Sequence, residues 1–217
     1  KTPYAYKTTD FGATWTNIIT DEVEGIVRNI QVDYENPDLL FLGTELGLYI
    51  TLNSGEKWYK FTNNMPSVAT HFIALQKQTN DLVLGTHGRG VIIIDDISPL
   101  RELNNKVMDK TLHFFNSKPT VIKETKSFSG GFGNETQFVG RNKSSQAQIK
   151  YHLKKRHTFG KMTMAIVDQK GDTITELTPG KSKGINIVSW SYRKKQPKVA
   201  TGKTFSFGGF TTPIVPA

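Results

Sequence analysis

The chain has 217 residues, 36% of them hydrophobic, with 19 Gly, 9 Pro and 13 Phe, a composition typical of many short strands and turns rather than of a helical protein. Zero cysteines exclude a disulfide framework and a thiolate metal site, and no apolar run approaches the roughly 20 residues of a membrane-spanning helix. The net charge of +9 is unevenly divided, with −3 over residues 1–119 and +12 over 120–217. We therefore expect two units with different surfaces, although the length alone would also allow one large β domain.

The first pattern along the chain is KTTDFGATWTNI at 7–18. An aspartate or asparagine at the start of a tight turn can accept hydrogen bonds from the backbone N–H groups two and three residues on, and glycine supplies the positive φ that such turns need. Asp10 and Gly12 fit these two roles, Thr8 can bond across the mouth of the hairpin, and Trp15 can cover the turn. The pattern therefore predicts a folded turn rather than a catalytic acid.

This pattern returns 43 residues later, in the T-x-N-x-G-x-x-W pattern at 51–58. Thr51, Asn53, Gly55 and Trp58 occupy the corresponding positions. Asparagine keeps the hydrogen-bonding capacity of aspartate and loses its acidity. A position that accepts either residue is suited to a structural role and unsuited to acid chemistry.

A longer repeat contains this turn. Residues 30–61 align with 73–97 at an offset of 42 to 43 residues, matching Ile30 to Ile73, Asp38 to Asp81 and Gly43 to Gly85. Alternating runs at 26–32, 39–44, 48–52 and 57–61 predict four short strands separated by Gly, Asn, Pro and Asp turns. Four strands in about 43 residues is the size of one β-propeller blade.

The T-x-D-x-G-x-T-W stretch at 8–15 resembles the Asp-box, or BNR repeat, of sialidase-like and sortilin/VPS10-like β-propellers, with a degenerate copy at 51–58. Residues 36–58 and 80–103 are similar to the last blades of bacterial proteins described as BNR-repeat glycosyl hydrolases. In these proteins a closing segment like LHFFNSKPTV (112–121) precedes a fibronectin-III-like or FlgD-type sandwich. The resemblance implies an all-β chain, with the last two to three blades of a partial propeller over 1–122 and an incomplete β-sandwich over 147–217.

Residues 123–146 are polar and glycine-rich, which predicts a linker or long loop. The GGFG sequence at 130–133 precedes no expected helix, so we do not expect it to bind phosphate. Alternation returns from 147, with a hairpin around the turn at 168–172. Ile149, Tyr151 and Leu153 are expected to alternate with solvent-facing residues, and Trp190 to lie in the sandwich core. Because the chain begins at Lys1 and stops at TTPIVPA, we expect it to be part of something longer.

Two groups of residues are candidates for binding. His87 and Arg89 lie in the glycine-rich loop GTHGRG at 85–90, although this stretch also fits a tight strand connection in which Arg89 pairs with Asp95 or Asp96. The second group is basic and is expected to attract an acidic glycan or anionic surface if two β segments bring its members together; solvated loops are the alternative. Its members are Lys154, Lys155, Arg156, His157, Arg193, Lys194, Lys195 and Lys198. The aromatics near them, Tyr151, Phe159 and Tyr192, are too sparse to favour a nucleic-acid site.

Candidate catalytic residues are few. Glycosidases use two carboxylates flanking the scissile bond. Glu45, after the strand at 39–44, is the one candidate we single out, with Asp33 a second acid able to reach a central cleft. Asp95 and Asp96 are adjacent and point to opposite faces of a strand, so they cannot form such a pair.

Other enzyme classes lack supporting patterns. Arg28, Arg89 and Arg101 are the only arginines before residue 119 and form no convincing sialidase triad. The five histidines show no metal-ligand spacing, so no metal or cofactor is expected.

Two functions of different class follow from these patterns. The first is a secreted or cell-surface module that binds protein or glycan without catalysis. The second is part of a glycoside hydrolase, sialidase-like or xyloglucanase-like, whose catalytic acids lie mainly outside these residues. The expected partners are the rest of the same propeller or a larger complex and, from the resemblance, outer-membrane secretion machinery; no transmembrane segment and no nucleic acid are expected.

Overall fold

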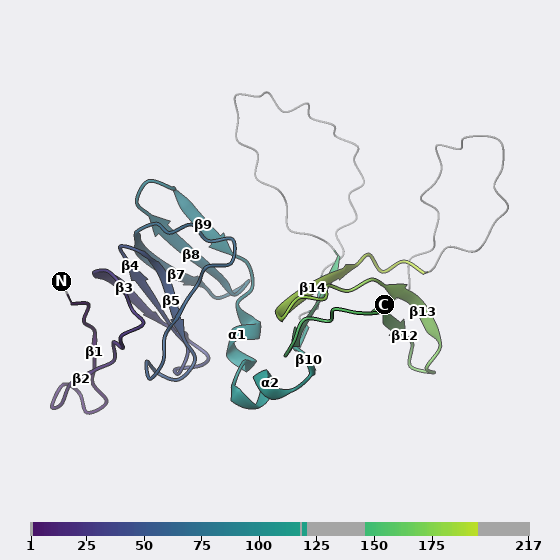
Figure 1. The fold of residues 1–217 in the computed structure, drawn as a ribbon, viewed down its shortest axis with the longest axis horizontal. Coiled ribbons are helices and arrows are strands. Elements are labelled where there is room, and N and C mark those ends of the chain that lie inside the picture. The colour runs from purple at the N-terminus through teal and green to yellow at the C-terminus, as the bar shows by residue number, and fades with distance from the viewer. Residues whose placement is uncertain (1, 118, 121–145, 195–217) are drawn as a thin grey trace, which may run out of the picture. The chain divides into compact units, whose positions relative to one another are not determined.

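The structure is a computed structural model that describes residues 2–117, 119–120 and 146–194. The expected all-β class is confirmed, since the described residues form antiparallel sheets and two short helices (Figure 1). The chain divides between Val107 and Met108 into two compact units. No helix in the described ranges is long and apolar enough to cross a membrane.

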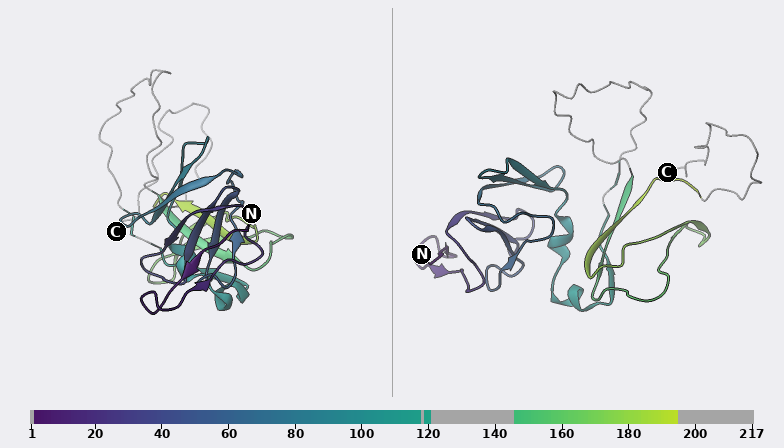
Figure 2. Two further views of the ribbon diagram at one scale, coloured as in Figure 1. Left: turned by 90° about the vertical axis from the view of Figure 1, so that its left-hand side faces the viewer. Right: turned by 45° about the horizontal axis from the view of Figure 1, so that its top comes forward.

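The first unit contains three sheets, which the two views of Figure 2 show from further sides. The first is the two-stranded hairpin of β1 (Tyr6–Lys7) and β2 (Thr16–Asn17). The second has the order β3-β4-β5-β6, with β3 (Val27–Val32), β4 (Leu40–Thr44), β5 (Gly47–Thr51) and β6 (Tyr59–Lys60). The third has the order β7-β8-β9, with β7 (Thr70–Gln76), β8 (Asp81–Thr86) and β9 (Val91–Ile94). The four strands predicted within one repeat are therefore confirmed for 26–61.

The β3–β6 sheet is covered on both faces, which explains why every residue of β4 and β5 is buried. On one face Phe41, Leu48 and Ile50 pack against Ile73 and residues of β8. On the other, Leu42, Tyr49 and Trp58 pack against Ile18 and Val23, which follow β2. A strand buried on both faces reads as a continuous apolar run, which is the pattern of LLFLGT.

The two larger sheets are in tight contact at Gly43. A Cβ atom at this position would lie 2.5 Å from the carbonyl oxygen of Thr70, so only glycine fits against β7. The equivalent Gly85 of the third sheet is less confined, because a Cβ there would meet the side chain of Phe72 at 3.3 Å.

The outer face of the β7–β9 sheet is uncovered. Pairing within β8 and β9 places Val83 opposite Ile93 and Gly85 opposite Val91, as Phe41 is opposite Ile50 and Gly43 opposite Leu48 in the second sheet. Ile50 is 6% exposed, whereas its counterpart Ile93 is 58% exposed. The same face thus packs on a neighbouring sheet in one repeat and lies open in the next.

Two short helices follow β9. Helix α1 (Ser98–Glu102) has Pro99 in its first turn, where proline costs no hydrogen bond, and α2 (Asn105–Asp109) crosses the boundary between the units. The predicted boundary at 122 differs from this one. Residues of the expected propeller-closing segment form β10 (Leu112–Phe114), which pairs with β11 in the second unit, because apolar alternation alone does not identify a strand's partner.

The described residues of the second unit form two sheets. Strands β10, β11 (Ala147–Leu153) and β14 (Gly184–Trp190) form one, and β12 (Met164–Val167) and β13 (Thr173–Leu177) form the predicted hairpin. Tyr151 and Leu153 are buried as expected, but the predicted alternation with solvent-facing residues is wrong, because Lys150 and His152 are buried as well, each 6% exposed. Trp190 is half-buried rather than fully buried, and its indole N–H donates to the carbonyl of Arg193. Of the predicted linker, 123–145 lies outside the described residues, as do Lys195, Lys198 and the remaining C-terminal residues.

Candidate functional site

The turn between β1 and β2 is organised by the carboxylate of Asp10. One oxygen accepts hydrogen bonds from the Thr8 hydroxyl and the Thr14 backbone N–H, both at 2.8 Å, and the other accepts from the Thr14 hydroxyl at 2.6 Å. The Thr8 hydroxyl in turn accepts from the N–H of Gly12, whose φ is +96°. Asp10 therefore closes the turn.

The turn between β5 and β6 repeats this geometry. Asn53 accepts from the Thr51 hydroxyl at 2.8 Å and from the Lys57 N–H at 3.0 Å, while the Thr51 hydroxyl accepts from the N–H of Gly55, whose φ is +97°. We call the 8–15 and 51–58 segments the twin turns. The sequence predicted the accepting residue and the glycine of each turn, but the predicted donors were wrong. Asp10 and Asn53 accept from the N–H four residues on rather than two and three residues on, because the N–H of the glycine donates to the threonine hydroxyl instead.

The ionisation of Asp10 argues against acid catalysis. Hydrogen bonds from the side chain and backbone of Thr14 and from the side chain of Thr8 lower the pKa of Asp10 to about 2. A general acid needs a pKa near the working pH. Asp10 is ionised at any ordinary pH and has no proton to donate.

The tryptophans of the twin turns have different surroundings. Trp58 is 1% exposed and donates from its indole nitrogen to the carbonyl of Ile18 at 2.7 Å, which joins the second sheet to the segment after β2. Trp15 is 59% exposed and donates to Gly12 within its own turn. Trp58 therefore links two neighbouring repeats. Trp15 occupies the equivalent position in its own turn, but it makes no such hydrogen bond to a neighbouring repeat among the described residues.

Two equivalent hairpin loops carry the candidate residues of the first unit. The β4–β5 loop follows Thr44 with Glu45, and the β8–β9 loop follows Thr86 with His87. Gly43 of β4 lies against Thr70, and Thr70 pairs with Thr86 of β8, so the two loops lie near each other at the same edge of these neighbouring sheets.

The candidate side chains of these two loops make different contacts. Glu45 forms an ion pair with Arg28. The imidazole of His87 stacks on that of His71, with ring centroids 5.7 Å apart, and Arg89 is exposed. Thr86 bonds to the carbonyl of Gly90 through its N–H and hydroxyl, which is the tight connection that the glycines allow.

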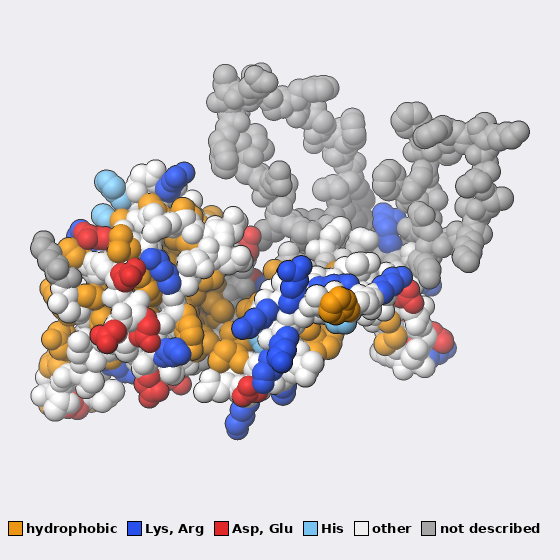
Figure 3. All heavy atoms as spheres, viewed as in Figure 1, with side chains coloured by type: hydrophobic (Ala, Val, Ile, Leu, Met, Phe, Trp, Pro, Cys, Tyr) orange, Lys and Arg blue, Asp and Glu red, His pale blue; other side chains and the backbone are white. Residues whose placement is uncertain are grey.

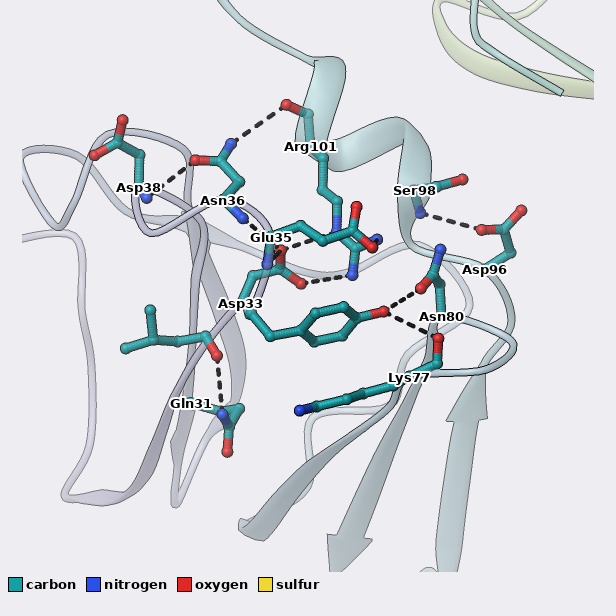
Figure 4. Close-up of polar contacts among 12 residues, drawn as sticks. Gln31, Asp33, Glu35, Asn36, Asp38, Lys77, Asn80, Asp96, Ser98 and Arg101 are labelled. Atoms are coloured by element: carbon teal, nitrogen blue, oxygen red, sulfur yellow. Dashed lines mark hydrogen bonds and ion pairs between the residues drawn. The ribbon is translucent and has the colours of Figure 1, made fainter. Parts of the chain in front are cut away.

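Asp33 belongs to a buried ionic cluster that fastens α1 to the loop after β3 (Figure 4). Arg101 donates from Nε and Nη2 to the two carboxylate oxygens of Asp33, each at 2.8 Å, and from Nη1 to Glu35. The guanidinium carbon lies 4.6 Å from the ring centroid of Tyr34, and Asp33 also accepts from the N–H of Asn36. These contacts leave Asp33 no free face for a substrate.

The pKa values of Asp33 and Arg101 are set by their burial and by the hydrogen bonds they make. Burial would raise the pKa of Asp33, but the hydrogen bonds from Arg101, Asn36 and Glu35 outweigh it and hold that pKa below its ordinary value. Burial would likewise lower the pKa of Arg101, and Asp33 holds it above its ordinary value. Asp33 is therefore a structural carboxylate rather than a proton donor.

Asp96 also has a backbone partner, since its carboxylate accepts from the N–H of Ser98 at the start of α1. Its own N–H donates to the carboxylate of Asp81, the residue that corresponds to Asp38 in the next repeat. Asp96 is thus occupied with the helix start.

Among the described residues, Lys154 to His157 and Arg193 with Lys194 do not come together in one patch, which was one of the two alternatives that the sequence left open. The pairing of β11 with β14 places Leu153 opposite Gly184 and Ala147 opposite Trp190. Lys154 to His157 therefore follow one end of this strand pair, and Arg193 and Lys194 follow the other, roughly 20 Å away for strands of this length.

A different set of residues joins Lys154 to His157. The His157 N–H donates to the carbonyl of Lys181 at 3.0 Å, and the Lys181 ammonium donates to the carbonyl of Gly160 at 2.6 Å. Lys181 and Lys183 precede β14 and were not singled out in the sequence, because their proximity follows from the antiparallel register rather than from spacing. A groove of about 440 Å³ lies at this end of the unit.

Comparisons with known proteins add no relative: no family model, no curated protein and no solved structure matches this chain. Within the described residues, no cluster of three or more His, Cys, Asp or Glu side chains is arranged to hold a metal ion. The function must therefore be argued from the geometry of the chain itself.

Proposed function

We propose that this chain is a noncatalytic binding module for glycan or protein, built on the stacked sheets of a β-propeller-type repeat. The repeat is supported by the twin turns, which make the same hydrogen bonds 43 residues apart, and by the packing of the β3–β6 sheet between its neighbours. The exposed Trp15 and Ile93 support further sheets of the same kind on either side.

The noncatalytic assignment rests on one observation: each acid considered for catalysis is engaged in a structural contact. Asp10 closes a turn, Asp33 is bound by Arg101, Asp96 accepts from the start of α1 and Glu45 is paired with Arg28. Glycosidase chemistry needs two carboxylates free to face the substrate. The exposed loops at the edge that carries Glu45 and His87 are instead suited to binding on a rigid scaffold.

The experiment is a binding and turnover assay on the 217-residue protein. A panel of immobilised polysaccharides and extracellular proteins is screened for binding, and each bound polysaccharide is then incubated with the protein while reducing ends are measured. We expect binding without release of reducing ends, unchanged by Glu45→Gln. Release of reducing ends that Glu45→Gln abolishes would establish the glycoside-hydrolase alternative instead, and failure to bind any glycan or extracellular protein would refute the module.

A secreted or cell-surface location and contact with outer-membrane secretion machinery remain predictions from the resemblance described above. A binding role at the cell surface is compatible with the uncovered sheet face and the exposed loops.

A further inference from the structure

The loop that joins β11 to β12, residues 154–161, carries most of the positive charge near the groove of the second unit. We call this segment the basic loop; its cations are Lys154, Lys155, Arg156 and Lys161. Figure 3 shows lysine and arginine side chains gathered on this unit. All four of these residues are exposed, so their charges face solvent or a ligand.

The basic loop has a defined conformation. Gly160 adopts φ +82°, and its carbonyl accepts from the ammonium of Lys181. The N–H of His157 donates back to the carbonyl of Lys181, so two hydrogen bonds tie the loop to the segment before β14. Binding groups held in this way lose less conformational entropy on binding than groups on a free loop.

The groove lies beside this loop and has an apolar floor. Leu153, Met162 and Thr111 line it together with Lys155 and Arg156. A concave site with an apolar lining and a few convergent charges is the usual form of a ligand site.

The acidic residues that line the groove do not neutralise all of its positive charge. Asp109 is the one carboxylate among its lining residues, and it is bound to Lys154 at 2.9 Å. No ion pair joins Lys155 or Arg156 to another residue of the described ranges. Two cations are therefore available to an anionic ligand.

An exposed aromatic ring lies in the same loop. Phe159 is 86% exposed, between Arg156 and Lys161. Exposing a phenyl ring to water is unfavourable, and aromatic side chains are enriched where a partner covers them. Phe159 does not line the groove, but a flat apolar ring in the same loop as several cations suits the face of a pyranose ring that bears an acidic group.

We propose that the basic loop and its groove bind an acidic polysaccharide, in which carboxylate or sulfate groups pair with Lys155 and Arg156 and a sugar ring stacks on Phe159. This inference rests on the proposed function and names its ligand class. A single-stranded nucleic acid is less suited, because successive bases need several stacking rings and Tyr151 is fully buried while Tyr192 packs on Trp190.

The test measures binding of the 217-residue protein to polygalacturonate and to dextran sulfate, with neutral dextran, an oligo-dT strand and phosphatidylglycerol vesicles as comparisons. The double variant Lys155→Ser/Arg156→Ser is paired with Lys57→Ser/Lys170→Ser, which removes the same charge from exposed positions elsewhere. Phe159→Ser is paired with Phe11→Ser, another exposed phenylalanine.

We expect binding to the acidic polysaccharides that weakens with salt, a loss of about tenfold or more in the Lys155/Arg156 variant, and a change below twofold in its control. Phe159→Ser should weaken binding and Phe11→Ser should not. Equal losses in the two charge variants, or tighter binding to oligo-dT or vesicles, would overturn the inference.

The two proposals fail in different ways. If the protein binds glycans and the basic-loop variants bind them as well as the parent does, this inference is wrong and the binding module stands. If the protein binds no glycan or protein, or turns a polysaccharide over, the proposed function itself is wrong.

Discussion

Replacing Arg101 with methionine tests whether the Asp33 cluster stabilises the first unit. The side chains of Arg101 and Asp33 are 8% and 0% exposed, so the variant leaves a carboxylate buried without its counter-charge. Removing one partner of a buried pair costs about 3–5 kcal/mol. Asp33 keeps the hydrogen bonds from the N–H groups of Glu35 and Asn36, which places the expected loss near the lower end of that range, about 3 kcal/mol.

The assay is urea unfolding followed by the fluorescence of Trp58, in a background carrying Trp15→Phe and Trp190→Phe so that only the core of the first unit is observed. Arg28→Met is the matched control, since it breaks the exposed pair with Glu45 and should cost about 1 kcal/mol or less. If Arg101→Met costs no more than Arg28→Met, the cluster does not behave as a desolvated ion pair and the reasoning is refuted.

The same pair predicts a pH dependence. Because the folded-state pKa of Asp33 is lowered, the stability that its carboxylate contributes is fully present above the ordinary carboxyl pKa of about 3.9 and is lost as the pH falls through the folded value. The difference in unfolding free energy between the parent and Asp33→Asn should therefore shrink in acid. A difference that stays constant from pH 7 to pH 3 would contradict the assignment.

Three further predictions concern the repeat. Gly43→Ala should destabilise by about 1–3 kcal/mol through the clash with Thr70, and clearly more than Gly85→Ala in the same urea assay; equal losses would contradict the close approach. Asp10→Asn should leave the melting temperature nearly unchanged, and Asp10→Ala should lower it. The stability that the Asp10 carboxylate contributes should be lost in acid, below its ordinary pKa. An equal effect of the two variants on the melting temperature would contradict the structural role of Asp10 in the turn. Trp58→Ala should cost about 3–5 kcal/mol in urea unfolding followed by circular dichroism, since the variant removes the fluorophore, and a loss below 1 kcal/mol would show that its burial is unimportant.

The local features of the first unit could be predicted from the sequence. Strand alternation, the turn residues and the 43-residue period are properties of short segments, so the four-stranded sheet and the twin turns follow from residues close together in the chain. The replacement of Asp10 by Asn53 in the second turn even predicted that the acid is structural.

The partners of the candidate residues could not be predicted in this way. Arg101 meets Asp33 across 68 residues, and nothing in either segment identifies the other. From the sequence alone, Arg101 was of interest only as one of the three arginines that form no convincing sialidase triad. Its real contact depends on where α1 docks, which is set by packing of the whole unit.

What the sequence by itself determined is the all-β class, the repeat and its turns, because these depend on local backbone preferences and the alternation of apolar residues. Only the tertiary structure decided that LHF at 112–114 pairs within the second unit, and that Lys154 to His157 meet Lys181 rather than Arg193. Both results depend on strand register, because an antiparallel pair brings together residues whose distance along the chain says nothing about which ends will meet.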